Sequence, residues 1–232
     1  MKKKILAVIP ARGGSKGIPR KNIKEICGKP LITYTIEAAL ACGYIDRVII
    51  STDDKEIAEV SKASGGEVPF LRPEALAGDN SPTIDCVIDL LERLKLNDGY
   101  EPDYVALLQC TSPLRNSKHI VESIEKLDKS NRDGIISVCE SDTNPYWMNV
   151  INDGKLEYFI EEGRSITKRQ DLPKVYTMNG AIYIIKTDIL INERTFEPQN
   201  IGAYVMTQKD SVDIDEMLDF EIAELIMKEK VR

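Results

Sequence analysis

Short apolar runs alternate with helical patterns along most of the 232-residue chain. The runs that predict strands lie at residues 5–9, 47–51, 104–109, 135–139, 179–185 and 201–206. The segments between and after them predict helices at 30–40, 54–64, 82–96, from 117 onward, at 188–192 and at 216–229. This alternation is typical of an α/β fold, in which crossover helices join the strands of a mostly parallel sheet.

The alternation is interrupted between residues 141 and 176. Residues 148–151 and 155–159 predict the two strands of a β-hairpin, because the turn sequence Asn152-Asp153-Gly154 lies between them. A charged loop follows at 161–174. We therefore expect one domain over residues 1–232, with a small inserted β-rich element at about 141–176 that lies outside the main sheet.

A loop rich in glycine and cationic residues follows the first predicted strand. Its glycines allow backbone amides to face a ligand, and its side chains add positive charge; these residues are Gly13, Gly14, Gly17, Arg12, Lys16, Arg20 and Lys21. The spacing fits neither the Rossmann G-x-G-x-x-G fingerprint nor a Walker A loop. A polyphosphate suits such a loop at the end of a strand, and a solvated basic connection between strand and helix is the alternative.

Two carboxylates near the end of the chain form a second candidate site. Asp213 and Asp215 are two residues apart, so both point the same way if the segment is extended. Such a pair can hold Mg²⁺ together with substrate phosphates. Alternatively, Asp215 only caps the last helix. The metal site is the favoured interpretation, because the cationic loop would hold the phosphates that the metal bridges.

Polar residues also follow the predicted strand at 104–109. Gln109 to Arg115 lie at the sheet edge where α/β proteins bind ligands, although a simple turn into the next helix is the alternative. The segment at 70–81 could contact a base and ribose, but its spacing alone indicates a polar connector. His119, the one histidine, has no obvious partner, so we expect it at the surface or an interface.

Composition narrows the class of partner. The net charge of −7 argues against nucleic acid, and no apolar run approaches the ~20 residues that span a membrane. Through residue 30, nine lysines and arginines stand against Glu25 alone, which favours a small anionic ligand. The five cysteines form no C-x-x-C pair and predict neither a zinc site nor a disulfide framework, so we expect a cytoplasmic protein with reduced thiols.

The segment Ile-Pro-Ala-Arg-Gly-Gly-Ser-Lys-Gly-Ile-Pro-Arg-Lys-Asn at 9–22 resembles the signature of acylneuraminate cytidylyltransferases, the CMP-sialic acid synthetases. The resemblance continues in order over nearly the whole chain, at 28–32, 50–54, 70–73, 108–115, 179–184 and 211–215. It implies a Rossmann-like nucleotidyltransferase fold and a homodimer, in which the inserted element reaches the neighbouring subunit's site.

The resemblance also implies a reaction and residue roles. CMP would pass from CTP to the anomeric hydroxyl of a nonulosonic acid of the N-acetylneuraminate or legionaminate type, with Mg²⁺ as cofactor and pyrophosphate as the second product. Arg12, Lys21 and Asp213 would be catalytic, and Asp213 and Asp215 would bind the metal. The nucleotide would contact Arg12, Gly13, Ser15, Lys16, Lys21, Asn22, Arg72 and Ser81. The sugar would contact Gln109, Ser112, Tyr183 and, from the partner subunit's insertion, the residue equivalent to Arg169.

Some positions depart from the family pattern. Cys110 stands where many relatives carry proline, and residues 144–147 and 168–173 look more like the bacterial legionaminic-acid branch than the N-acetylneuraminate branch. These differences leave the sugar open. Two alternatives are a cytidylyltransferase for another sugar acid, of the 3-deoxy-octulosonate or pseudaminate type, and a non-catalytic CTP-binding regulator on the same fold. No residue is assigned as the general base.

Overall fold

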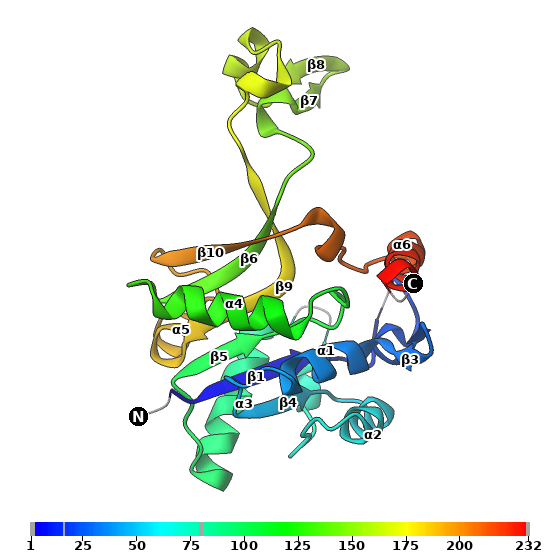
Figure 1. Cartoon of the computed structure of the whole chain (residues 1–232), viewed down its shortest axis with the longest axis vertical. Helices are drawn as coiled ribbons and strands as arrows, with labels where there is room; N and C mark the ends of the chain where they lie inside the picture. The colour runs from blue at the N-terminus through cyan, green and yellow to red at the C-terminus, as the bar shows by residue number, and fades with distance from the viewer. Residues whose placement is uncertain (1–2, 16, 79–80, 231–232) are drawn as a thin grey trace.

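A six-stranded central sheet organises the molecule (Figure 1). The computed structural model describes residues 3–15, 17–78 and 81–230. The sheet order is β10-β6-β9-β5-β1-β4, with bounds β1 Ile5–Pro10, β4 Arg47–Ser51, β5 Tyr104–Leu107, β6 Gly134–Glu140, β9 Tyr176–Lys186 and β10 Ile201–Met206. Of these six strands, β9 alone runs opposite to the others, so the expected α/β fold with a mostly parallel sheet is confirmed.

Helices cover both faces of the sheet. On one face lie α1 (Leu31–Leu40), α2 (Lys55–Ala63) and α4 (Ser117–Asp128); on the other lie α3 (Thr83–Asp98) and α5 (Thr187–Glu193). Alternate residues of β1 join the two apolar clusters, with Ala7 and Ile9 on the first face and Leu6 and Val8 on the second. Burial on both faces explains why β1 is a continuous apolar run rather than an alternating one.

A side chain caps the start of α2 but not the start of α3. The Asp54 carboxylate accepts the Ile57 N–H at 3.0 Å at the start of α2, which is typical of an aspartate at this position. The pair Ser81-Pro82 predicts a helix with Ser81 as its cap and Pro82 as its first residue, but this is wrong: the helix begins at Thr83, and Pro82, whose backbone is extended, occupies the N-cap position. Ser81 instead donates from its hydroxyl to the Ala75 carbonyl at 3.3 Å, so it remains in the loop before the helix.

Residues between β6 and β9 form an arm that projects from the main sheet (Figure 1). Its hairpin pairs β7 (Asn149–Asn152) with β8 (Lys155–Tyr158), as the sequence predicts. The turn contains two consecutive left-handed residues, Asp153 (φ 48°) and Gly154 (φ 78°), which is the geometry that this turn sequence favours. Several large apolar side chains on the arm are exposed in the single chain: Trp147, Met148, Ile151, Leu156 and Phe159.

The C-terminal helix α6 (Met217–Lys230) leaves several large apolar side chains exposed. Helical spacing predicts that Leu218, Ile222, Leu225 and Ile226 share one face, and the first three are 60%, 41% and 63% exposed. Phe220 and Ala223 are buried instead, in a cluster that also contains Ile18, Ile26, Leu31 and Ile214. This cluster, together with a short hairpin of β2 (Glu25–Ile26) and β3 (Lys29–Pro30), ties the end of the chain to its beginning. None of the helices described has both the length and the apolar composition needed to cross a membrane.

Candidate active site

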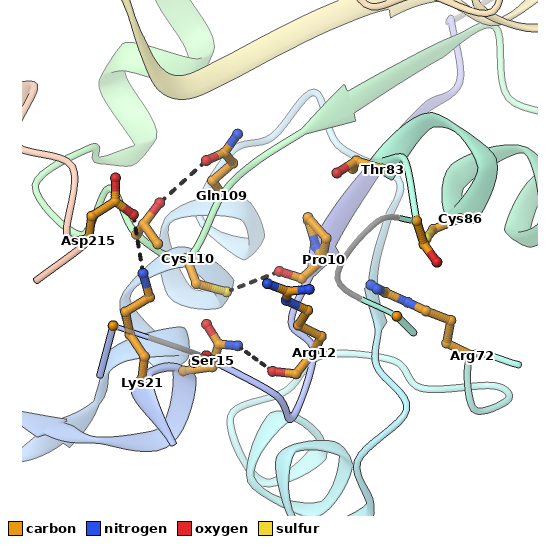
Figure 2. A pocket seen from close by; sticks show the side chains of 15 residues that line it. Pro10, Arg12, Ser15, Lys21, Arg72, Thr83, Cys86, Gln109, Cys110 and Asp215 are labelled. Atoms are coloured by element: carbon orange, nitrogen blue, oxygen red, sulfur yellow. Dashed lines mark hydrogen bonds and ion pairs between the residues drawn. The ribbon is translucent and has the colours of Figure 1, made fainter. Parts of the chain in front are cut away.

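A cavity of about 580 Å³ opens at the carboxyl ends of β1 and β5 (Figure 2). Its walls come from the loop after β1, the loop before α3, the segment after β5 and the segment before α6. This volume is typical of small-molecule sites. The sequence-predicted residues that line it are Arg12, Ser15, Lys21, Asn22, Arg72, Ser81, Gln109 and Asp215.

The loop after β1 is closed by its own side chains. Asn22, which is buried, donates from Nδ2 to the Arg12 carbonyl at 3.0 Å, so the two ends of the loop are joined. Arg12 and Lys21 from this loop bring positive charge to the cavity wall. Arg20, which the sequence adds to that charge, is instead ion-paired with Asp54 and with a second carboxylate on α2. Lys16 lies outside the described residues.

The N-terminal loop meets Asp215, one of the two C-terminal carboxylates, at this cavity. Lys21 donates from Nζ to the Ile214 carbonyl at 2.6 Å, and Nζ lies 3.4 Å from Asp215 Oδ1. The two segments approach so closely that a Cβ on Gly17 would lie 2.3 Å from the Asp215 carbonyl oxygen, which only glycine permits. Residues 193 positions apart in the sequence therefore form one wall.

Asp213 has the most perturbed environment of the predicted site residues. Its Oδ1 is buried and has no hydrogen-bond partner among the described residues. Burial raises the pKa of Asp213 and so does the nearby Asp215, whereas a hydrogen bond from the Thr111 hydroxyl and the charge of Lys21 lower it. A buried acceptor without a partner, two residues from a second carboxylate, fits a divalent cation that shares its coordination with substrate phosphates.

The alternative that Asp215 only caps α6 is not favoured. Asp219 Oδ2 accepts the backbone N–H groups of both Asp215 and Glu216 at 2.9 Å, so another carboxylate already serves the start of the helix. The Asp215 carboxylate is exposed on the cavity side, beside Lys21. Among the described residues, no group of three or more His, Cys, Asp and Glu side chains is placed to hold a metal. A metal on this pair of carboxylates would need further ligands from a substrate.

Of the four residues predicted to contact the sugar, Gln109 is the one that lines this cavity. Thr111 Oγ1 lies 3.4 Å from Gln109 Oε1, which places Gln109 in the neighbourhood of the carboxylates. Ser112 is fully buried and donates to the Asn179 carbonyl at 3.4 Å, so in this structure it supports β9. Tyr183 packs edge-on against Phe196 with ring centroids 6.1 Å apart, and burial raises its pKa.

Arg169 lies on the arm, as its proposed role in a neighbouring subunit requires. Its guanidinium lies 4.0 Å from the Asp142 carboxylate, and both residues line a cavity of about 430 Å³ at the base of the arm. The described chain therefore does not bring Arg169 to the cavity that contains Arg12.

Arg115, from the polar segment after β5, is a structural residue rather than a wall of the cavity. Its guanidinium is fully buried and donates to the Gln109 carbonyl at 3.1 Å, the Ala181 carbonyl at 3.3 Å and the Thr35 hydroxyl at 2.7 Å. Burial lowers the pKa of Arg115 to about 10. These bonds hold the segment that contains Gln109 against β9 and α1.

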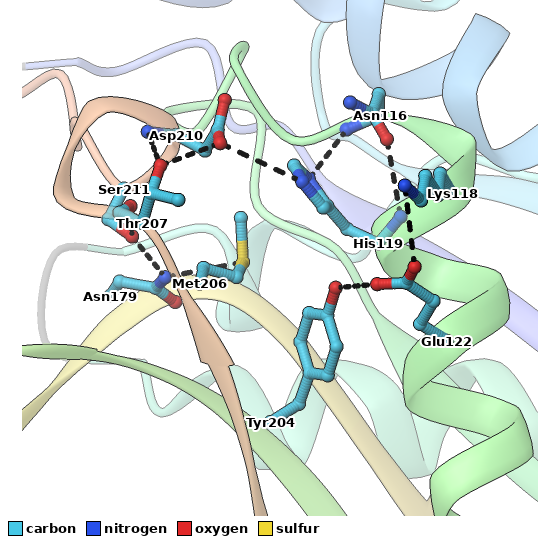
Figure 3. Close-up of polar contacts among 10 residues, drawn as sticks. All are labelled: Asn116, Lys118, His119, Glu122, Asn179, Tyr204, Met206, Thr207, Asp210 and Ser211. Carbon is cyan, nitrogen blue, oxygen red and sulfur yellow. Dashed lines mark hydrogen bonds and ion pairs between the residues drawn. The ribbon is translucent and has the colours of Figure 1, made fainter.

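A second polar network fixes the segment before Asp213 (Figure 3). Asn179, which is buried on β9, donates from Nδ2 to the Ser211 hydroxyl at 2.8 Å. His119 on α4 places Nε2 3.9 Å from Asp210 Oδ2, and its side chain is only 12% exposed. His119 is thus mostly buried between α4 and this segment, and it does not line the cavity.

Four further residues line the cavity, and sequence reasoning gave them no role: Pro10, Gly78, Thr83 and Cys86. Thr83 and Cys86 are three residues apart on the first turn of α3, so they share a side of the helix. The sequence feature that could have indicated these two residues is Ser81-Pro82, which predicts that a helix starts at this edge of the sheet. A helix N-terminus that faces a cavity can contribute to ligand binding.

Comparison with known proteins gives a consistent result. A family profile described as Cytidylyltransferase matches residues 6–227. The chain is 36% identical to post-translational flagellin modification protein B of Campylobacter coli over 227 residues, which cover 97% of this chain and 96% of that protein. It is 36% identical to CMP-N,N'-diacetyllegionaminic acid synthase of Legionella pneumophila and 33% identical to pseudaminic acid cytidylyltransferase of Campylobacter jejuni, with 97% of each chain covered in both cases.

A solved structure of CMP:2-keto-3-deoxy-manno-octonic acid synthetase complexed with CTP superposes with a TM-score of 0.73 over 98% of this chain and 99% of that one. The sequence identity is 19%, so this similarity concerns the fold. The assignment of this chain to a family therefore rests on the sequence matches, which extend over nearly its full length. The fold, the sheet-edge cavity and these matches agree, and the chain belongs to the cytidylyltransferase family.

Proposed function

We propose that the protein transfers CMP from CTP to the anomeric hydroxyl of a nonulosonic acid and releases pyrophosphate. The single observation that supports this most is the meeting of Arg12 and Lys21 with Asp215 at one cavity, in a member of the cytidylyltransferase family. Cations there suit the triphosphate, and carboxylates suit a metal that the triphosphate shares. The relatives named for CMP-legionaminic and pseudaminic acid synthesis support the substrate class.

The chain's own residues would act by position and charge. The anomeric hydroxyl loses its proton to solvent, its oxygen attacks the α-phosphorus, the bond from that phosphorus to the bridging oxygen breaks, and pyrophosphate leaves. Arg12 and Lys21 hold the phosphates and stabilise the charge that develops on them. Arg72, Ser81 and the first turn of α3 contact the nucleoside, and Gln109 orients the sugar acid.

Asp213 and Asp215 are the residues that would hold Mg²⁺. When bound, this cation neutralises phosphate charge and favours ionisation of the attacking hydroxyl. Lys21 would help to position the two carboxylates, because its hydrogen bond to the Ile214 carbonyl fixes the residue between them. The buried, unpartnered Oδ1 of Asp213 supports this assignment.

The proposed active form is a homodimer. The exposed apolar side chains of the arm and the exposed face of α6 are surfaces that a second copy of the chain would cover. In that dimer, Arg169 of one subunit would reach the carboxylate of the sugar acid in the other. We place the enzyme in the cytoplasm with its nucleotide substrate, with neither nucleic acid nor membrane as a partner.

A substrate panel tests the function directly. The purified protein, with Mg²⁺ and CTP, is given N-acetylneuraminate, di-N-acetyllegionaminate, pseudaminate and 3-deoxy-octulosonate, and pyrophosphate release is followed while mass spectrometry identifies the CMP-sugar. We expect release with a nonulosonic acid and with CTP rather than other nucleoside triphosphates. Binding of CTP without release on any acid would contradict the proposal and favour the regulator.

A further inference from the structure

We infer that residues 51–54, which form the end of β4 and the turn into α2, position the nucleotide-binding groups without contacting the nucleotide. Three separate sets of hydrogen bonds and ion pairs, here called ties, connect these residues to the loop after β1 and to Arg72. The inference deepens the proposed function and rests on it, because the ligand served by these ties is the triphosphate and nucleoside of CTP.

The first tie holds the start of the glycine-rich loop. The Gly13 N–H donates to Asp53 Oδ1 at 3.1 Å, and the neighbouring Ala11 N–H donates to the Ser51 carbonyl at 3.0 Å. A Cβ on Gly13 would lie 2.8 Å from Asp54 Oδ2, so the loop can lie this close to the turn only with glycine there. Gly13 directly follows Arg12, so its fixed position also determines where the backbone of Arg12 lies. Its N–H donates to Asp53 rather than to a ligand.

The second tie holds the far end of the same loop. Asp54 forms an ion pair with Arg20, whose backbone is left-handed (φ 57°), and this contact is the main reason that the pKa of Asp54 is lowered. Asp54 is itself fixed, because its Oδ1 also accepts the Ile57 N–H as the cap of α2. Adjacent carboxylates of one turn therefore hold both ends of the loop that contains Arg12 and Ser15.

The third tie orients Arg72. Its Nη2 donates to the Ser51 carbonyl at 2.6 Å, its Nε donates to the Ser51 hydroxyl at 3.1 Å, and its backbone N–H donates to the Thr52 carbonyl at 2.7 Å. These bonds use one edge of the guanidinium. Arg72 lines the cavity, so its other edge is the one presented to a ligand (Figure 2).

Charge and positioning make opposite predictions for Asp53. A carboxylate beside a triphosphate site repels the ligand, so its removal should tighten CTP binding if charge alone matters. If Asp53 acts as the anchor of Gly13, its removal should weaken CTP binding, because the loop loses its fixed path before the ligand arrives. The sign of the change therefore separates the two roles.

The experiment measures CTP affinity by calorimetry for the wild type, Asp53→Ala, Asp53→Asn and the control Glu59→Ala, which removes an exposed acid of α2 without touching the loop. We expect Asp53→Ala to bind about tenfold more weakly, whereas Asp53→Asn, which keeps an acceptor oxygen, stays within about threefold of wild type. Turnover at saturating CTP should change by less than about threefold in both, because the reacting groups are intact.

Equal or tighter CTP binding by Asp53→Ala would overturn the inference, and so would an Asp53→Asn variant as weak as Asp53→Ala. If the wild type itself fails to bind CTP, the proposed function fails instead. A second pair covers the case in which Asp53→Ala does not fold. Arg20→Ala should weaken CTP binding about threefold or more, with no further loss on addition of Asp54→Asn, which keeps the helix cap. Wild-type affinity of Arg20→Ala, or additive losses, would contradict positioning through Asp54.

Discussion

Replacement of Asp213 by asparagine should make the protein more stable and inactive. Burial and the charge of Asp215 raise the pKa of Asp213, and its Oδ1 has no partner among the described residues. Because folding raises this pKa, the ionised carboxylate opposes folding at any pH above the folded value. The destabilisation is relieved as the pH falls through that value, when the folded protein takes up a proton.

The size of the effect follows from the unpartnered oxygen. A buried polar atom without a hydrogen bond costs about 1–3 kcal/mol, and more when it is charged. The amide of Asp213→Asn keeps part of this cost and loses the charge, so we expect a gain of about 1 kcal/mol. For a chain of this size, such a gain corresponds to about 2–4 °C in Tm. Turnover should fall by a factor of about 100 or more, as for loss of a group that stabilises transition-state charge.

The assay is thermal unfolding at neutral pH without divalent cations, followed by pyrophosphate release with CTP, Mg²⁺ and the preferred sugar acid. The matched control is Asp215→Asn, whose side chain is 83% exposed, so its Tm should shift by less than about 1 °C while turnover is still lost. The stability gained by Asp213→Asn should shrink as the assay pH is lowered. Wild-type turnover, or a Tm several degrees below wild type, would refute the reasoning about Asp213.

Three further changes test the same cavity. Gly17→Ala places a Cβ 2.3 Å from the Asp215 carbonyl oxygen, so CTP affinity measured by calorimetry should fall about tenfold or more; unchanged affinity would mean that the two segments separate freely. Thr111→Val removes the hydroxyl that lowers the pKa of Asp213, so the acid limb of the pH–rate profile should move to higher pH, whereas Thr111→Ser should restore it. Ile214→Ala empties a fully buried site between the two carboxylates and should cost about 2–5 kcal/mol in unfolding free energy, measured by denaturant titration, together with lost turnover.

The strands could be predicted from local pattern alone where burial is continuous. The sequence places strands at 47–51 and 201–206, and the structure has β4 and β10 with the same bounds. The hairpin turn at Asp153 and Gly154 was equally accessible, because positive φ values depend on residue type more than on tertiary contacts. The orientation of β9, in contrast, depends on which edges of β5 and β6 are available, and no local pattern contains that information.

The packing of α6 could not be predicted from its own apolar pattern. The helix has two apolar sides, and the one that packs is determined by the cluster of Ile18, Ile214 and Phe220 rather than by its own periodicity. That same cluster brings the Asp213–Asp215 segment to the loop after β1. The site could be anticipated as two complementary motifs, but the packing that joins them depends on residues far apart in the chain.

The position of charged groups at the cavity could likewise not be predicted from the sequence alone. Nine cations in the first 30 residues suggest a uniformly basic end, yet several are engaged by acids from other elements. These ion pairs are Lys3 with Asp128, Arg20 with Asp54, and Lys29 with Glu37. The cavity wall contains a small set of cations at defined positions, with Arg12 and Lys21 from the loop and Arg72 from across it. Stabilisation of a transferring phosphoryl group depends on such fixed placement more than on net charge, because donors that are already oriented need not reorganise as charge develops.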